Sequence, residues 1–263
     1  MARLVLDLNK SIEENASDYY DNAKRIKKKI LGAEVALQKS YLKLEELESK
    51  REKDEEKEQK QSALKERKKE WYEKFRWFLS SDGFLVVGGR DATSNEIVIK
   101  KHTESNDLVF HTDIAGSPFF VIKAENKKIP GSTIKEVADA TCTFSKAWKL
   151  GLHTTEVFYV SPDQVSRKAK SGEYLTKGAF MIYGKTNYVE SKVNLAIGMA
   201  ESNAIMSGPL EAIKKSCKKY VILKQGDEKS SSMAKKISHK LGGNLDIDEI
   251  IRALPAGEFS IKG

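Results

Sequence analysis

A repeating pattern of apolar residues marks the first part of the chain. These residues recur at alternating steps of four and three, and Ser40 fills the one slot that has no apolar side chain. Such a pattern, sustained over five heptads, predicts a long helix that takes part in a coiled coil. Asn9 or Ser11 is placed to cap the start of this helix. The residues of this heptad seam are Ile12, Ala16, Tyr19, Ala23, Ile26, Ile30, Ala33, Leu37, Leu44 and Leu47.

The extent of this helix is set by the absence of residues that break helices. Neither Pro nor Gly interrupts the chain from Ala33 to Ser81, so we expect a continuous helix that frays near residues 50–63, where the sequence is polar all round. Tyr72 and Phe75 fall in the same register. Before the helix, residues 3–8 alternate like a short strand.

A heptad seam needs a second helix to cover it. The rest of the chain offers no second heptad run of this length. The partner helix is therefore expected either in another copy of this chain or in sequence that is missing here. The first alternative is a dimerisation stalk, and the second is one arm of a coiled-coil hairpin. The periodicity of the seam favours neither the stalk nor the hairpin.

Residues 77–200 have globular composition and alternate between strand and helix patterns. Short apolar runs such as Phe84–Val87 predict strands, and the run from Gly131 to Gly151 predicts a helix that ends at the second glycine. A hairpin is expected around Gly184. The order of these elements predicts an α+β fold, with a mixed sheet covered by helices.

Residues 201–263 are expected to form one strand and two helices. This length is too short for a large independent core. We therefore expect a small α/β extension that packs on residues 77–200. The sequence thus predicts three parts, with a short strand and coiled-coil arm over residues 1–76, a globular domain over 77–200 and an extension over 201–263.

Composition excludes several classes of protein. No apolar run of the chain reaches the roughly 18 residues needed to span a membrane, so we expect no membrane association. Cys142 and Cys217 match no metal or redox spacing, and the four histidines are isolated. We find no nucleophile elbow and no glycine-rich nucleotide motif. The sequence therefore predicts a cytoplasmic protein that is not an enzyme and binds no cofactor and no metal.

The net charge of +8 suggests an acidic partner, but it marks no site, because the excess is spread over all three parts of the chain. A local cluster says more. Between Arg167 and Lys185 five bases accompany one acid, Glu173, and tyrosines and glycines are interspersed with them. Bases with aromatic residues on glycine-flanked loops are typical of RNA binding. The alternative is a solvated loop beside core aromatic residues.

Nine residues are the candidates for contact with RNA. Arg90 follows a glycine pair and precedes a helix, where backbone N–H groups can hold a phosphate, although a plain strand-to-helix turn is the alternative. His111 ends a strand-like run, and it is either a structural residue or an RNA contact. The candidates are Arg90, Lys100, Lys101, His111, Arg167, Lys168, Lys170, Lys177 and Lys185.

Three segments resemble the C-terminal half of the NFACT family. They are "WYEKFRWFLSSDGFLVVGGRDATSNEIVIKKH", "DLVFHTDIAGSPFFVIK" and "GEYLTKGAFMIYGKTNYV". The segment "VLDLNKSIEENASDYYDNAK" resembles the start of the family's second coiled-coil arm. The resemblance covers about residues 3–192 in the family's order, and residues 201–263 resemble an archaeal-type extension.

This resemblance implies a role in ribosome-associated quality control. Family members bind the large ribosomal subunit that carries a stalled peptidyl-tRNA, and they recruit tRNA. Residues 77–192 would be the RNA-binding domain called NFACT-R, with large-subunit rRNA or tRNA as its partner. The family's N-terminal domain, which is tied to peptide tailing, is not part of this sequence, so tailing is not assigned to it. The alternative is a coiled-coil adaptor for proteins that does not bind RNA directly.

Overall fold

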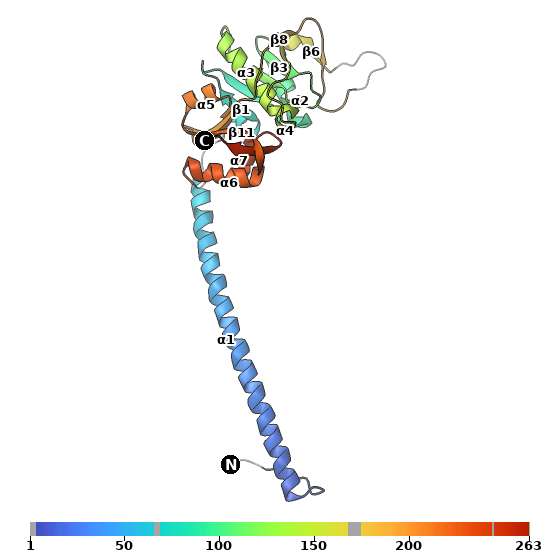
Figure 1. Ribbon diagram of the computed structural model, residues 1–263, viewed down its shortest axis with the longest axis vertical. Coiled ribbons are helices and arrows are strands. Elements are labelled where there is room, and N and C mark those ends of the chain that lie inside the picture. Colours follow the sequence, from blue (N-terminus) through green and yellow to red (C-terminus); the bar gives the residue numbers. More distant parts are fainter. Residues whose placement is uncertain (1–3, 66–68, 168–174, 244, 263) are drawn as a thin grey trace. The chain divides into compact units, whose positions relative to one another are not determined.

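The chain folds as two units, Met1–Glu66 and Arg67–Gly263 (Figure 1). A computed structural model describes residues 4–65, 69–167, 175–243 and 245–262, with the side chains of the first unit described as far as residue 48. The first unit is a long helix with a short segment before it. The second contains two sheets and their covering helices, which confirms the predicted α+β fold class.

The first unit is built on α1 (Ile12–Lys65), a continuous helix of 54 residues. Ser11 caps it, because its hydroxyl accepts a hydrogen bond from the Glu14 amide while the Glu14 carboxylate accepts one from the Ser11 amide. The heptad seam is exposed within this unit. Ile30 and Leu37, for example, are 52% and 58% exposed. The described seam therefore has no covering helix within this unit.

Residues 4–8 form no strand, in contrast to the prediction from their alternation. The segment instead folds back along the first turns of α1. The Asn15 side chain accepts a hydrogen bond from the Asp7 amide and donates one to the Asp7 carbonyl oxygen. The Tyr19 hydroxyl bonds to both the amide and the carbonyl oxygen of Val5. These side chains satisfy backbone groups that a neighbouring strand would otherwise have to pair.

The helix does not continue to Tyr72 and Phe75, although both fall in the heptad register. A 3-10 helix, η1 (Trp71–Lys74), contains Tyr72, and the Phe75 side chain is 3% exposed in the core of the second unit. The heptad register therefore continues past Lys65 without a coiled coil, because the second unit buries Phe75 and partly buries Tyr72.

The second unit contains a six-stranded sheet of order β1-β2-β4-β3-β5-β8, in which every pairing is antiparallel. Successive residues along each strand point alternately to the two faces of the sheet, and both faces pack on core clusters. Val86 and Phe110 contribute to one core cluster, whereas their neighbours Val87 and Val109 contribute to the other. The strands are β1 (Arg76–Leu79), β2 (Leu85–Gly88), β3 (Leu108–Thr112), β4 (Phe120–Ile122), β5 (Val157–Val160) and β8 (Asn187–Val189).

Helices supply side chains to both core clusters of this sheet. Val98 of α2 (Ala92–Lys101) belongs to the cluster of Val87, and Val137 of α3 (Gly131–Phe144) belongs to the cluster of Val86. The single helix predicted from Gly131 to Gly151 is divided at Ser145, which ends α3 and caps a short α4 (Lys146–Lys149). The central strands of the six-stranded sheet are therefore buried on both faces, whereas the edge strand β8 is largely exposed.

The predicted hairpin around Gly184 is wrong. β7 (Met181–Ile182) pairs with β6 (Val165–Ser166), which follows the 3-10 helix η2 (Pro162–Gln164), whereas β8 pairs with β5. The Gln164 side-chain amide donates hydrogen bonds to the carbonyl oxygens of Tyr183 and Lys185, at 2.8 and 3.0 Å. Gln164 thus holds the turn on η2, and the two segments go to different sheets.

A four-stranded sheet of order β10-β9-β11-β12 completes the second unit. β9 (Leu195–Ala200) pairs with β10 (Ile205–Gly208) on one side and with the long β11 (Cys217–Lys229) on the other. The predicted strand and two helices of residues 201–263 are present, as β11, α6 (Ser230–Leu241) and α7 (Ile247–Ala253). The sequence missed β10, α5 (Leu210–Ser216) and β12 (Glu258–Ile261).

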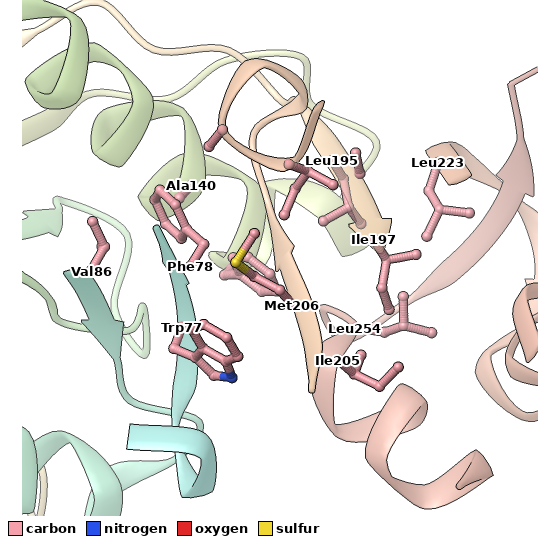
Figure 2. Close-up of a cluster of buried hydrophobic side chains, with 14 of the residues drawn as sticks. Trp77, Phe78, Val86, Ala140, Leu195, Ile197, Ile205, Met206, Leu223 and Leu254 are labelled. Atoms are coloured by element: carbon pink, nitrogen blue, oxygen red, sulfur yellow. The ribbon is translucent and has the colours of Figure 1, made fainter. Parts of the chain in front are cut away.

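The two sheets share one core. Edge strands β1 and β10 lie beside each other, and the Met206 side chain of β10 packs against Phe78 of β1 (Figure 2). The Leu79 amide contacts the Met206 sulfur at 3.3 Å. A Cβ at Gly208 would lie 2.8 Å from the Phe78 ring, so glycine permits this close approach. Residues 201–263 are therefore part of the same core as the six-stranded sheet.

We expect Met206→Ala to destabilise the whole second unit. The Met206 side chain is fully buried, and truncation would leave a cavity, so the free energy of unfolding should fall by about 2–5 kcal/mol. Trp77 of β1 and Trp148 of α4 report on different parts of the unit, and their fluorescence should change in one denaturant transition. Leu150→Ala, at a 62% exposed position, should cost less than about 0.5 kcal/mol. Separate transitions would contradict the shared core.

Candidate nucleic-acid interface

Glu96 on α2 joins two basic segments that are distant in the sequence. Its carboxylate oxygens lie 3.3 Å from the Lys100 ammonium group and 3.0 Å from a guanidinium nitrogen of Arg167. The Gly178 amide donates a further hydrogen bond of 3.1 Å to the same carboxylate. That bond, together with Lys100 and Arg167, holds the pKa of Glu96 below its ordinary value. Glu96 thus fixes residues 167 and 178 against α2.

A cavity of about 400 Å³ lies at this junction. Lys100 and Arg167 are its basic residues, and apolar side chains such as Phe180 form the rest of its wall. The Phe180 ring contacts Phe119 edge-on, with 5.3 Å between ring centroids, so the cavity wall continues into the core. Its other lining residues are Ile99, Thr103, Val109, Pro162 and Val165.

Five of the predicted contact residues lie on the surface. Lys100 and Arg167 meet at Glu96, and Lys177 precedes the Gly178 amide that binds there. Their side chains, like those of Lys101 and Lys185, are exposed. The structure therefore brings Lys100, Arg167 and the Lys177–Gly178 turn together. Lys168 and Lys170 lie outside the described residues.

His111 has structural contacts. Its Nε2 lies 3.2 Å from the Ser117 carbonyl oxygen, and its ring stacks on Phe119 with centroids 4.1 Å apart. Burial lowers the pKa of His111, so the neutral ring is favoured at neutral pH. These contacts anchor the turn of residues 114–117, and an RNA contact of His111 stays a prediction.

Arg90 does not join the Glu96 junction. Its guanidinium group donates hydrogen bonds to the carbonyl oxygens of Glu73 and Phe75, both at 3.0 Å. The preceding glycine serves packing, since a Cβ at Gly89 would lie 1.9 Å from the Asn95 side-chain oxygen. Asp91 caps α2 by accepting a hydrogen bond from the Ser94 amide. The strand-to-helix turn is therefore the better description of this motif than a phosphate cradle.

Sequence reasoning missed an aromatic stack beside Lys101. The Trp71 ring, 38% exposed, stacks on His102 with centroids 4.2 Å apart and planes at 13°. Burial and the nearby charges of Lys74, Lys123 and Lys101 lower the pKa of His102. The heptad register conceals this stack. Because Tyr72 and Phe75 fall in that register, the sequence places Trp71 in the long helix and gives it only a packing role.

An α+β domain with exposed bases on a helix and a neighbouring loop is typical of proteins that bind nucleic acid. Residues 74–184 match the family described as "NFACT protein RNA binding domain". The chain belongs to the NFACT family, as its sequence resemblance predicted. It therefore carries the RNA-binding domain of that family.

Two curated relatives support this assignment. The "Archaeal Rqc2 homolog aRqcH" of Methanocaldococcus jannaschii is 40% identical over 207 residues, which cover 77% of this chain and 30% of that protein. The "Ribosome quality control complex subunit NEMF homolog" of Drosophila melanogaster is 36% identical over 200 residues, which cover 74% of this chain and 19% of that protein. The chain thus spans less than a third of the length of either relative.

The solved structures offer a weaker likeness. The C-terminal part of the fibronectin/fibrinogen-binding protein from Streptococcus suis aligns with a TM-score of 0.39 and 18% identity, over 46% of each chain. A likeness of this size does not define the fold.

Two other kinds of feature are absent from the described part of the chain. None of its helices has the length and apolar character that a membrane span needs, and no three His, Cys, Asp or Glu side chains gather as metal ligands would.

We expect the Gly178 amide to report on Glu96. The pKa of Glu96 lies below its ordinary value of 4.5, so the junction is fully formed above pH 4.5 and weakens as the pH falls through the lower, folded-state pKa. The amide shift of Gly178 in ¹H–¹⁵N spectra should follow this protonation. In Glu96→Gln the titration should vanish, because the amide side chain does not ionise. A Gly178 shift that is independent of pH in the unaltered chain would contradict the junction.

Proposed function

We propose that this chain is the RNA- and ribosome-binding part of a ribosome-associated quality control factor. In this role it binds the large ribosomal subunit that carries a stalled peptidyl-tRNA, and it recruits tRNA in the cytoplasm. The family match and the names of the relatives support the proposal. Its RNA partner is large-subunit rRNA or tRNA.

The observation that carries the proposal is the convergence at Glu96. Arg167 lies 71 residues and Gly178 lies 82 residues from Glu96 in the sequence, yet both bind this carboxylate. Exposed bases from α2 and from the loop thereby form one surface that can contact neighbouring phosphates. Phosphate contacts supply much of the affinity of proteins for nucleic acids.

In the proposed role the chain acts by binding, without a catalytic step or a cofactor of its own. RNA incubated with the protein should therefore keep its length. Shortened RNA would require a reactive group that this proposal does not contain.

The RNA interface is tested by reversing the charges that converge on α2. A variant with Lys100→Glu, Lys101→Glu and Arg167→Glu should bind tRNA and the large subunit about tenfold more weakly or worse. The slope of log affinity against log salt concentration should become shallower by about 0.7–0.9 for each phosphate that the variant no longer binds. Binding should be measured over a range of salt concentrations.

The control for this experiment is a charge reversal on α6, which lies apart from β6 in the same unit (Figure 1). Lys235 and Lys240 are exposed there, so Lys235→Glu with Lys240→Glu alters the net charge without touching the Glu96 junction. If both variants lose affinity equally, net charge alone accounts for binding and the interface is wrong. Unchanged binding in both variants would also overturn it.

A second candidate function is a coiled-coil adaptor for other proteins, and the exposed heptad seam of α1 favours it. We propose that the seam pairs with a second helix, from another copy of this chain or from the missing arm. The Val5–Tyr19 hydrogen bonds turn the segment before α1 back along this helix, which supports an antiparallel partner. Pairing through an apolar seam should depend much less on salt than RNA binding does.

Self-association of the chain tests this pairing. Ile30 lies on the seam and Leu31 lies off it, and they are 52% and 65% exposed. Ile30→Asp should weaken self-association about tenfold or more, since it places a charge in the apolar interface. Leu31→Asp should have little effect. Light scattering at high concentration measures both, and a strict monomer in the unaltered chain would contradict pairing between copies.

A further inference from the structure

A second cavity lies away from the Glu96 junction, where the start of the globular unit meets its C-terminal part. It has a volume of about 370 Å³. Arg76 of β1 and Arg90 line it from one side, and Arg252 of α7 lines it from the C-terminal part. We call this cavity the three-arginine pocket.

Arg76 is held in the pocket wall by two contacts. Its side chain donates a hydrogen bond of 2.5 Å to the Gly89 carbonyl oxygen, and its guanidinium carbon lies 5.0 Å from the centre of the Phe144 ring. Burial and the nearby charge of Arg90 lower the pKa of Arg76 to about 10. Arg76 therefore stays charged at neutral pH, even though it is buried beside a like charge.

Arg90 is held by the carbonyl oxygens of Glu73 and Phe75. Burial and the nearby charge of Arg252 lower the pKa of Arg90. Arg90 thus lies close enough to Arg76 on one side and to Arg252 on the other for their like charges to act on each other. Like charges held together at an energetic cost are typical of a binding site.

Two N–H groups of these arginines have no acceptor among the described residues. The Nε atoms of Arg76 and Arg90 are buried and lack a hydrogen-bond partner among the described residues. A buried donor without an acceptor is unfavourable by about 1–3 kcal/mol. Such groups are uncommon in folded proteins and call for an explanation.

The carboxylates of Glu70, Glu73 and Glu249 also line the pocket, but the bonds described for them are to groups other than its three arginines. Asp91 accepts a hydrogen bond from the Ser94 amide, Glu249 pairs with Lys69, and Glu73 accepts one from the Glu70 amide. Among the described residues, no ion pair joins Arg76, Arg90 or Arg252 to a carboxylate. The charges of Asp91 and Glu249 act on the arginines only at longer range. The pocket therefore has positive charge that its own acids do not neutralise by contact.

We propose that the three-arginine pocket binds a phosphate group. A phosphate offers several acceptor oxygens and up to two negative charges, which suit three converging guanidinium groups better than a single carboxylate does. Lys74, which also lines the pocket, adds positive charge, whereas the charge of Lys69 is paired with Glu249. The phosphate comes either from an RNA backbone or from a free phosphate ion. The site goes beyond the proposed interface at Glu96 and does not depend on it.

The experiment follows the Nε–H signals of Arg76 and Arg90 in ¹H–¹⁵N spectra of the full chain at neutral pH and constant ionic strength. Inorganic phosphate, acetate and a ten-nucleotide oligouridylate are titrated separately. Both signals should shift saturably with a phosphate-bearing probe and much less with acetate. Arg252→Gln should weaken this response about tenfold or more, because it removes one charge-assisted contact.

Arg252 is exposed and its side chain makes no hydrogen bond to the described residues, so its replacement should leave the fold intact. Arg252→Lys keeps the charge but not the forked geometry, and its response should fall between those of the unaltered chain and Arg252→Gln. Arg25→Gln on α1 removes a guanidinium group elsewhere and should have no effect. Unchanged tryptophan fluorescence of each variant confirms folding.

The outcomes distinguish the two possible sources of the phosphate, an RNA backbone and a free phosphate ion. Shifts with the oligonucleotide that inorganic phosphate reverses support the pocket with RNA as its ligand. Shifts with inorganic phosphate alone support it with a free ion. No shift with either probe, or an equal shift with acetate, overturns it. Arg167→Glu should lower RNA affinity without altering the inorganic phosphate response, so failure of the Glu96 interface and failure of this pocket are distinguishable.

Discussion

The core shared by the two sheets is the constraint on which the globular unit depends. Met206 of β10 packs against Phe78 of β1, and Gly208 lets β10 approach β1 closely. Because the central strands of the six-stranded sheet are also buried on both faces, its exposed bases can come only from helices, loops and edges. The same packing brings Arg252 of α7 to the side of Arg76 and Arg90.

The basic side chains of this unit are arranged in two different ways. At α2 one carboxylate, Glu96, pairs with both Lys100 and Arg167, which leaves a net positive charge, and it fixes the loop at Gly178. In the three-arginine pocket no described carboxylate pairs with the guanidinium groups, and two of their N–H groups lack an acceptor. The first arrangement organises a basic surface, and the second leaves positive charge and N–H donors that the described part of the chain does not pair.

Much of the fold was predictable because its signals are local. The heptad repeat predicted the helix, one of the two expected caps, Ser11, is formed, and the short apolar run Phe84–Val87 predicted the strand β2. The predictions that failed depended on distant partners. Tyr72 and Phe75 kept the heptad register, but both pack on the globular core, where Phe75 is buried and Tyr72 partly buried. Gln164 binds the turn at Gly184, so β7 and β8 form no hairpin.

The sequence by itself determined the α+β class, the long amphipathic helix, the NFACT resemblance and the residue types available to RNA. Each of these follows from periodicity or from a contiguous motif. Only the tertiary structure decided which bases meet. Arg167 reaches Glu96 across 71 residues, and Arg252 joins Arg90 only through the packing of α7 against β10. Contacts of this kind depend on the register and packing of elements that lie far apart in the chain, which local patterns do not encode.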